Sequence, residues 1–313
     1  MRLVFLGTPE FAVPTLERIL QGGHEVLAVV TQPDRPSGRG GRLAAPPVKQ
    51  LALRHGLPVY QPERIRRPEA VARLAALQAE VMVVVGYGQI IPQPVIDLPP
   101  RGILNVHASL LPRYRGAAPV QWAIVNGETR TGVTIMRIDA GLDTGDILLQ
   151  AETAIGPEET AIELAARLSG MGAALLVEAL DRLARGELPA RPQDPAEATY
   201  APLLKKEDGR LDWSQSAGAL HNRVRGMQPW PGAHTTFRRR NLQIWRSRLP
   251  AAPAPSLAPG RLRFSRALYA GCGGHSALEL LQVQLEGRKR IDAAEFANGQ
   301  HLTENDFLGD PLS

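Results

Sequence analysis

The chain has 313 residues, of which 44% are hydrophobic and 21% charged, proportions typical of a folded globular protein. This composition excludes a fibrous or globally disordered chain. No apolar run reaches the length of a membrane span, and a chain of this length suffices for two domains. The formal net charge of +5 is uneven, because residues 1–205 carry 21 basic and 21 acidic groups whereas residues 206–313 carry 15 and 10. We therefore expect the C-terminal part to prefer polyanions.

Short apolar runs alternate with helical patterns in the first half of the chain, as in parallel βαβ units. The predicted strands are 3–6, 26–30, 57–60, 81–85 and 103–107, and the predicted helices are 11–20, 47–55 and 69–77. Beyond them we expect an antiparallel strand pair at 133–138 and 147–151. A long helix is then expected to begin near Pro157 and to persist to Gly186. This pattern predicts an α/β domain with a mostly parallel sheet, spanning residues 1–188.

A proline-rich segment, residues 189–205, shows little periodicity and is predicted to be an interdomain linker. The elements predicted for the remaining domain, residues 206–313, are a strand at 210–213, a helix at 214–227, and strands at 234–237, 242–245, 261–264 and 278–283. Several short strands separated by Gly/Pro turns predict a small β-barrel, although a sandwich fits the pattern nearly as well.

The single cysteine, Cys272, excludes an internal disulfide, and no Cys/His cluster has zinc-ligand spacing, so we expect no structural metal. Cys272 lies in a glycine-rich, turn-like segment, which favours an inert thiol over a nucleophile. A turn signal at Gly7 interrupts the first apolar segment, so the N-terminus does not resemble a signal peptide and a cytoplasmic protein is expected. A monomer is the default expectation.

Two polar residues interrupt the apolar strand predicted at 103–107. Asn105 and His107 are two positions apart, so their side chains leave one face of the strand while the intervening aliphatic side chains leave the other. Polar side chains in a buried strand are costly unless they are partnered. We infer that this face carries chemistry, and the alternative is a hydrogen-bonded structural pair.

Three aspartates, Asp139, Asp143 and Asp146, lie in the loop between the predicted antiparallel strands. Their spacing does not match a calcium loop, in which carboxylates alternate more closely and end with a bidentate glutamate. We instead expect Asp143 to fold back towards His107 and to set its orientation and protonation, while the other two aspartates cap turns.

Two glycine-rich turns resemble parts of nucleotide-binding motifs but lack essential residues. The turn after the first predicted strand has Gly7 alone, and the turn at Gly86 and Gly88 lacks the third glycine of a dinucleotide fingerprint. Neither turn is followed by the lysine of a phosphate-binding loop, so a nicotinamide oxidoreductase is disfavoured. We expect Gly86 and Gly88 to form a tight turn at the C-terminal end of a strand, where open α/β sheets place ligands.

The segment Ser109-Leu-Leu-Pro112 continues from the polar strand into a proline-bounded turn. Its backbone groups are suited to pair with a flat heterocycle whose faces the two leucines would cover. The alternative is that these four residues only cap the strand.

A long basic segment, residues 32–43, separates a predicted strand from a predicted helix. Loops of this length inside a compact domain are usually functional or disordered. Its arginines, Arg35, Arg39 and Arg42, suit a phosphate backbone, and a solvated surface loop is the alternative. Similar basic clusters lie at 238–240 and 288–290.

Together these segments resemble those of the methionyl-tRNA formyltransferases, over essentially the whole chain. The specific matches are Gln-Pro-Asp-Arg-Pro-Ser-Gly-Arg-Gly at 32–40, Asn-Val-His-Ala-Ser-Leu-Leu-Pro-Arg-Tyr-Arg-Gly-Ala-Ala-Pro at 105–119, Gly-Val-Thr-Ile-Met at 132–136, Asp-Thr-Gly-Asp at 143–146, and segments 208–213, 225–232 and 287–290. The wider folate-dependent formyltransferase group shares the Asn, His and Asp set and the Ser-Leu-Leu-Pro turn. Those residues therefore indicate the reaction, whereas the basic loop and the basic C-terminal domain indicate the acceptor.

The resemblance implies a Rossmann-like N-terminal domain, an OB-like C-terminal domain that binds tRNA, and no metal. It implies transfer of a formyl group from N10-formyltetrahydrofolate to the α-amine of methionyl initiator tRNA, for translation initiation. The residues expected to be catalytic are Asn105, His107 and Asp143. Those expected to bind folate are Gly86, Tyr87, Gly88, Ser109, Leu110, Leu111, Pro112 and Asp139. Those expected to bind tRNA are Arg35, Arg39, Arg42, Arg238, Arg239, Arg240, Arg288, Lys289 and Arg290.

Three alternatives stay open at this point. A formyltransferase for a small amine, such as a nucleotide-sugar or glycinamide ribonucleotide, shares the catalytic set without needing the basic segments. A folate hydrolase would release formate without an amine acceptor. A non-catalytic RNA-binding protein would use the basic surface alone, which leaves the buried polar set unexplained.

Overall fold

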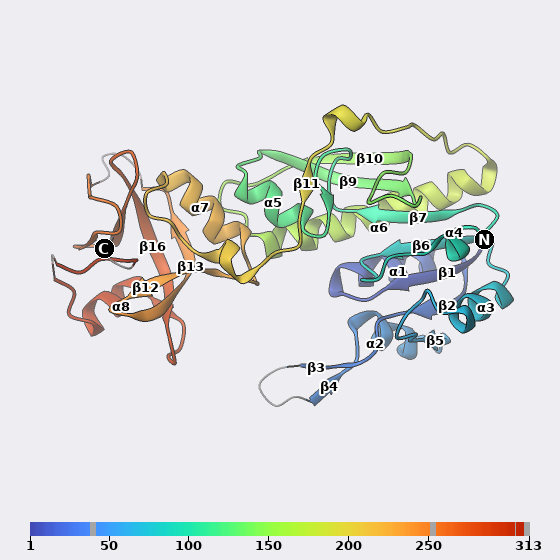
Figure 1. The fold of residues 1–313 in the computed structure, drawn as a ribbon, viewed down its shortest axis with the longest axis horizontal. Coiled ribbons are helices and arrows are strands. Elements are labelled where there is room, and N and C mark those ends of the chain that lie inside the picture. Colours follow the sequence, from blue (N-terminus) through green and yellow to red (C-terminus); the bar gives the residue numbers. More distant parts are fainter. Residues whose placement is uncertain (38–41, 251–254, 304, 310–313) are drawn as a thin grey trace. The chain divides into compact units, whose positions relative to one another are not determined.

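Figure 1 shows the computed structural model, which describes residues 1–37, 42–250, 255–303 and 305–309. The chain divides into two compact units, one formed by Met1–Gly116, Thr131–Thr153 and Ala165–Ala201, and the other by Ala117–Arg130, Ala154–Leu164 and Pro202–Ser313. Residues 189–205 were predicted to link the two domains. The part of this segment up to Ala201 belongs to the first compact unit. The predicted domain boundaries at 188 and 206 stay a prediction.

The first unit is built on a seven-stranded sheet in the order β10-β9-β7-β6-β1-β2-β5. Its strands are β1 (Arg2–Gly7), β2 (Glu25–Val30), β5 (Val59–Tyr60), β6 (Val81–Val85), β7 (Ile103–His107), β9 (Arg130–Arg137) and β10 (Ile147–Ala154). Parallel pairs join β1 to β2, β1 to β6, β6 to β7 and β2 to β5, whereas β7 pairs antiparallel with β9. The predicted mostly parallel sheet is confirmed, and its strand order reverses between β1 and β6, where open α/β sheets place ligands.

Prolines mark the starts of helices in this unit, because a residue in the first turn has no helical partner for its N–H. Helices α2 (Pro47–Arg54) and α3 (Pro68–Ala76) begin on proline, and α4 (Gln93–Ile96) follows one. Helix α1 (Val13–Gln21) is preceded by the short helix η1 (Glu10–Ala12).

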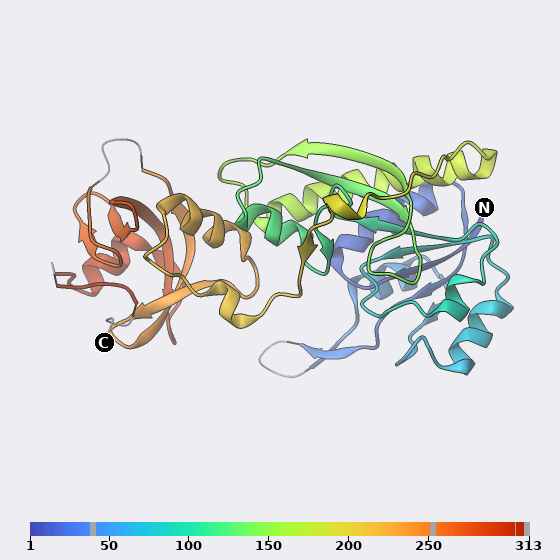
Figure 2. The same ribbon diagram turned by 45° about the horizontal axis from the view of Figure 1, so that its top comes forward.

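The long helix α6 (Ala161–Arg185) covers one face of β7 and β9, and Figures 1 and 2 both show it alongside these strands. A Cβ added at Gly172 would lie 2.7 Å from a methyl of Val106 and 3.3 Å from a methyl of Val133, so glycine permits the close approach. The residues of β7 that alternate with Val106 therefore face away from α6.

Helix α6 begins at Ala161 rather than near Pro157, and local hydrogen bonds explain the difference. Thr160 N donates to Glu163 Oε2 at 2.8 Å, and Glu163 N donates to Thr160 Oγ1 at 3.3 Å. These reciprocal bonds form a capping box, which fixes the first turn. The hydrogen bonds from Thr160 also hold the pKa of Glu163 below its usual value.

The second unit contains an antiparallel sheet in the order β12-β13-β16-β15-β14, with β17 paired to β16. Its strands are β12 (Ala233–Phe237), β13 (Arg240–Arg248), β14 (Leu262–Phe264), β15 (Leu268–Cys272), β16 (Ser276–Leu285) and β17 (Ile291–Asp292). Leu308 N donates to the Gly260 carbonyl at 2.7 Å beside β14, and Gly309 N donates to the Thr236 carbonyl at 2.9 Å on β12. Residues 306–309 therefore bridge the two edge strands and close the sheet into a small barrel. Of the barrel and the sandwich that the sequence allowed, the structure has the barrel.

The described α-helices that lie wholly in this unit are α5 (Pro119–Val125), α7 (Ala217–Gly226) and α8 (Ala293–Gly299), and a short 3-10 helix, η3 (Lys206–Gly209), precedes α7. The apolar core of the barrel includes Phe237 and Phe296, whose rings meet edge to face with centroids 5.1 Å apart. Within the described ranges, no helix combines the length and the apolar character needed to span a membrane.

The strand predicted at 210–213 is wrong. Residue 210 is joined to His234 by an isolated β-bridge and lies in no strand, and Trp213 is buried with its indole N–H donating to Thr235 Oγ1 at 3.0 Å. The apolar alternation of Leu211 and Trp213 therefore reflects two side chains inserted into the barrel core, not a strand in a ladder.

Candidate active site

Strand β7 presents Asn105 and His107 on the face that is turned away from α6. Asn105 is 9% exposed and His107 6% exposed. Asn105 lies opposite Val84 of β6 and Met136 of β9 in the sheet register. A carboxamide and an imidazole therefore lie together in the buried C-terminal half of a central strand.

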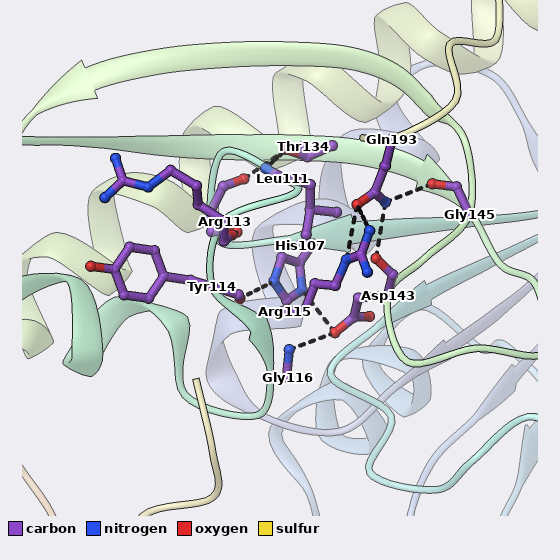
Figure 3. Close-up of polar contacts among 11 residues, drawn as sticks. His107, Leu111, Arg113, Tyr114, Arg115, Gly116, Thr134, Asp143, Gly145 and Gln193 are labelled. Carbon is purple, nitrogen blue, oxygen red and sulfur yellow. Dashed lines mark hydrogen bonds and ion pairs between the residues drawn. The ribbon is translucent and has the colours of Figure 1, made fainter. Parts of the chain in front are cut away.

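The imidazole of His107 is oriented by contacts at both nitrogens (Figure 3). Its Nε2 lies 2.9 Å from the backbone carbonyl oxygen of Tyr114. A carbonyl oxygen only accepts hydrogen bonds, so this geometry assigns a proton to Nε2. Nδ1 lies 3.7 Å from Asp143 Oδ2. Nδ1 is therefore the nitrogen that is left for chemistry.

Asp143 is held close to His107 by an unusual backbone conformation. Its φ is +52°, in the left-handed region that residues other than glycine seldom adopt. Its carboxylate Oδ2 accepts a hydrogen bond from Gly116 N at 2.8 Å. The structure thus brings Asp143 and His107 together, and their catalytic roles stay a prediction.

Two residues that sequence analysis missed complete this arrangement. Arg115, which is 5% exposed, donates from Nε and Nη2 to Gln193 Oε1, at 3.1 and 2.8 Å. Gln193 Nε2 donates to the carbonyl oxygens of Asp143 and Gly145, at 2.9 and 2.7 Å. Gln193 lies in the proline-rich segment, where neither periodicity nor a motif marks it. Arg115 lies within the matched segment 105–119, but its side chain carried no signal of this role.

The turn from Ser109 to Pro112 is held by hydrogen bonds within the turn and to the side chains of Thr134 and Gln150. Thr134 Oγ1 donates to the Ser109 carbonyl at 2.7 Å and accepts from Leu111 N at 3.1 Å. The Leu111 carbonyl accepts from Gln150 Nε2 at 2.9 Å, and Arg113 N donates to the Leu110 carbonyl at 3.1 Å. These backbone groups therefore have protein partners already, and the Leu110 side chain is partly exposed.

The turn after β6 has the conformation expected for glycine. Gly86 and Gly88 are exposed and have φ values of +55° and +86°, which favour glycine. Between them the Tyr87 carbonyl accepts hydrogen bonds from Thr8 Oγ1 and Gln32 Nε2. The Tyr87 ring is buried, its hydroxyl has no hydrogen-bond partner among the described residues, and burial raises the pKa of Tyr87 above its usual range.

Asp139, predicted to contact folate, caps its own loop. Its carboxylate accepts from Gly141 N at 3.0 Å and from Thr144 Oγ1 at 2.7 Å. The backbone carbonyl of Asp146 accepts from Arg137 N at 2.9 Å. In the described part of the chain, no cluster of three or more His, Cys, Asp or Glu side chains is arranged to hold a metal.

The basic segment near the N-terminus forms a hairpin where it is described. Strand β3 (Arg35–Ser37) pairs antiparallel with β4 (Arg42–Ala44). Arg35 is exposed, with Nη2 3.5 Å from Gln32 Oε1. Arg39 and the side chain of Arg42 lie outside the described part of the structure.

A charged cluster anchors the base of this hairpin. Lys49 Nζ lies 2.9 and 2.7 Å from the two carboxylate oxygens of Asp34. Gln61 Nε2 donates to Asp34 Oδ1 at 2.8 Å. Hydrogen bonds from Gln61 and Lys49 hold the pKa of Asp34 below its usual value. These contacts therefore fix the position of Asp34, the residue that precedes the hairpin.

Three arginines of the C-terminal clusters make side-chain contacts within their unit. Arg238 pairs with both carboxylate oxygens of Asp306, at 2.8 and 2.9 Å, and its guanidinium lies 4.8 Å from the Phe237 ring centroid. The guanidinium of Arg290 lies 4.8 Å from the ring centroid of Trp245. Arg240 Nη2 donates to the backbone carbonyl of Glu286 at 2.5 Å. All six residues of these clusters are exposed, including Arg239, Arg288 and Lys289.

The chain matches known proteins along nearly its whole length. The formyl transferase family model matches residues 1–180, and the model of the formyl transferase C-terminal domain matches residues 203–301. The methionyl-tRNA formyltransferase of Solibacter usitatus is 66% identical over 310 residues, and that of Koribacter versatilis is 57% identical over 311. Each of these alignments covers 99% of this chain and 99% of the relative.

Solved structures share the fold at lower identity. An N-formyltransferase from Helicobacter canadensis, in complex with folinic acid and dTDP-3-aminofucose, is 18% identical with a TM-score of 0.67, over 89% of this chain and 98% of that one. HypX from Aquifex aeolicus, in complex with tetrahydrofolic acid, is 17% identical with a TM-score of 0.65, over 95% of this chain and 47% of that one. With matches to both family domains and to full-length relatives, this chain belongs to the formyl transferase family.

Proposed function

We propose that this chain transfers the formyl group of N10-formyltetrahydrofolate to the α-amine of methionyl initiator tRNA, for translation initiation. The observation that carries the proposal is its 66% identity, over 310 residues, to a methionyl-tRNA formyltransferase. The site supports the chemistry, because Asn105 and His107 share one strand face and Asp143 lies beside His107.

The reaction needs no covalent enzyme intermediate, because the amine is itself the nucleophile. Its nitrogen forms a bond to the formyl carbon, and a tetrahedral oxyanion develops on the formyl oxygen. Asn105 and His107 stabilise that oxyanion by donating hydrogen bonds. The bond from carbon to N10 then breaks, N10 takes a proton, and the amine nitrogen loses one.

Asp143 and Tyr114 give the two nitrogens of His107 different roles. The Tyr114 carbonyl occupies Nε2, so the hydrogen bond to the oxyanion comes from Nδ1 of the imidazolium form. The Asp143 carboxylate, 3.7 Å from Nδ1, interacts favourably with that cation. Asp143 also helps to remove the amine proton, directly or through water.

We place the folate beside the ends of β6 and β7. The exposed turn at Gly86 and Gly88 lies where open α/β sheets bind ligands. Leu110 offers an apolar contact to a flat ring, whereas the backbone of its turn is engaged by Thr134 and Gln150. Asp139 contributes by shaping the loop that carries Asp143.

The tRNA acceptor is assigned to the basic segments. The hairpin that contains Arg35 and the exposed basic residues of the C-terminal barrel suit phosphates. Arg238 has its carboxylate partner in Asp306, so its own contribution to tRNA binding is expected to be smaller than that of Arg239.

The decisive experiment incubates the protein with N10-formyltetrahydrofolate and methionylated initiator tRNA and separates formylmethionine from free formate. We expect formylmethionine, formed in an amount equal to the tetrahydrofolate released. Free formate without an amine acceptor would instead indicate a hydrolase. Activity on an amino-sugar nucleotide but not on tRNA would indicate a small-molecule formyltransferase, and no turnover with either would indicate a binding protein.

We further propose that the protein works as a monomer in the cytoplasm. Sedimentation equilibrium of the purified protein tests the first statement, and fractionation of cells tests the second. A dimer at micromolar concentration or a membrane-associated pool would contradict them.

A further inference from the structure

We propose that Gln193 is a positioning residue, which holds the Asp143 carboxylate within reach of His107, and that residues 193–201 belong to the framework of the active site. The inference rests on the proposed function, because formyl transfer is its readout. It gives a role to a segment whose sequence predicted only a linker.

The side-chain amide of Gln193 is fully used, as Figure 3 shows. Its nitrogen donates to the carbonyls of Asp143 and Gly145, and its oxygen accepts from two nitrogens of Arg115. An amide nitrogen has two N–H groups and its oxygen two lone pairs, so no capacity is left over. The reverse orientation would set the amide oxygen against two carbonyl oxygens, which fixes the orientation seen.

Asp143 needs such support because its backbone is strained. Its positive φ costs energy for a residue with a Cβ and persists only where surrounding contacts impose it. Gln193 holds the Asp143 carbonyl, and Gly116 N holds the carboxylate at 2.8 Å. With both ends of the residue held, the carboxylate stays 3.7 Å from Nδ1 of His107.

The same segment also supports the other partner of His107. Strand β11 (Tyr200–Ala201) pairs in parallel with β8 (Arg115–Gly116). Thr199 Oγ1 accepts from Tyr114 N at 2.9 Å, and the carbonyl of Tyr114 orients His107. Residues 193–201 therefore hold the neighbours of both His107 nitrogens.

The first test compares Gln193→Met with a matched control. Methionine keeps the length of the side chain and removes its hydrogen bonds, so we expect kcat to fall by roughly 10- to 100-fold. The KM values for folate and tRNA should stay within about twofold, because no substrate contact is lost. The control is Glu187→Gln, which removes an exposed ion pair with Arg185 just before the proline-rich segment and should keep wild-type kcat.

A double-mutant cycle separates positioning from general damage. If Gln193 acts through Asp143, Gln193→Met should cost less than about twofold when it is added to Asp143→Asn. If the decrease in kcat of the double variant equals the product of the two single-variant decreases, the inference is overturned. A wild-type kcat for Gln193→Met would also overturn it. If thermal unfolding shows that Gln193→Met is not folded, Gln193→Glu takes its place. Glutamate keeps the acceptor for Arg115 and loses both hydrogen-bond donors to the carbonyls of Asp143 and Gly145. Wild-type protein that forms no formylmethionine overturns the proposed function instead.

Discussion

His107 Nε2 lies 2.9 Å from the carbonyl oxygen of Tyr114, while its Nδ1 faces Asp143 across 3.7 Å. One nitrogen therefore orients the ring and the other is available to the reaction. This division of roles is visible only in three dimensions, because the Tyr114 contact involves backbone and not a side chain.

Replacing His107 by glutamine or asparagine distinguishes its two nitrogens. Glutamine extends an amide towards the Nε2 position and can keep the bond to Tyr114, but it offers nothing at Nδ1. We expect His107→Gln to lower kcat by about 10²- to 10³-fold with little change in Tm. His107→Asn, whose amide nitrogen lies near the Nδ1 position, should retain more activity. Steady-state kinetics on both variants tests the order, and the reverse order contradicts the assignment.

Asn105→Ala tests the second oxyanion donor. Removing one such donor typically costs about 10² to 10³ in rate, so we expect kcat to fall by that factor while the fold is retained. Single-turnover kinetics with saturating folate and tRNA isolates the chemical step from binding. Near-normal turnover would remove Asn105 from the mechanism.

Lys49→Met tests whether the anchor of the basic hairpin serves tRNA binding. The change releases Asp34, so the hairpin loses its fixed base. We expect a rise in KM for methionyl initiator tRNA, on the order of tenfold, with the KM for folate within about twofold. Arg54→Gln removes one exposed positive charge from the same helix and is the matched control. Equal effects of the two variants would mean that charge alone matters.

Local patterns in the sequence located the strands that carry the site. β6 and β7 have the predicted bounds, because short, mainly apolar runs of that length are typical of buried strands in a mostly parallel sheet. Asn105 and His107 stood out because they interrupt such a run. The hairpin of β3 and β4 was not predicted, since its sequence has the glycines and arginines of a loop and not a strand period.

Gln193 and Arg115 were beyond prediction for a different reason. Their roles depend on contacts with Asp143 and with each other, across separations of 50 and 78 residues. Nothing local marks a glutamine in a proline-rich segment as an active-site support. The left-handed conformation of Asp143, which creates the need for that support, is likewise imposed by tertiary contacts.

Cys272 is expected to be chemically inert. It is fully buried in β15, and burial raises the pKa of Cys272 to about 12. At about pH 8 only roughly one thiol in ten thousand is then ionised, so alkylation by iodoacetamide should be very slow in the native protein and rapid after unfolding. Mass spectrometry follows the label. Rapid native labelling would contradict the burial, and loss of activity in a folded Cys272→Ala variant would contradict an inert thiol.

The ion pair between Asp306 and Arg238 is expected to stabilise the barrel in a pH-dependent manner. Hydrogen bonds from Arg238 and Thr303 hold the pKa of Asp306 below its usual value. Since the folded-state pKa lies below the unfolded-state value of about 3.9, this stabilisation is present above that pH and is lost as the pH falls through the folded-state pKa.

Asp306→Asn should therefore lower Tm by a few degrees near pH 7, about 1 kcal/mol, because the half-exposed Arg238 limits the strength of the pair. The difference from wild type should shrink as the pH falls below about 4, where the carboxylate is protonated first in the unfolded and then in the folded wild-type protein. Thermal unfolding across that range measures it, with Glu295→Gln as the control for loss of an exposed acid. A Tm difference that stays constant or grows on acidification would show that the carboxylate charge is not what stabilises this end of the barrel.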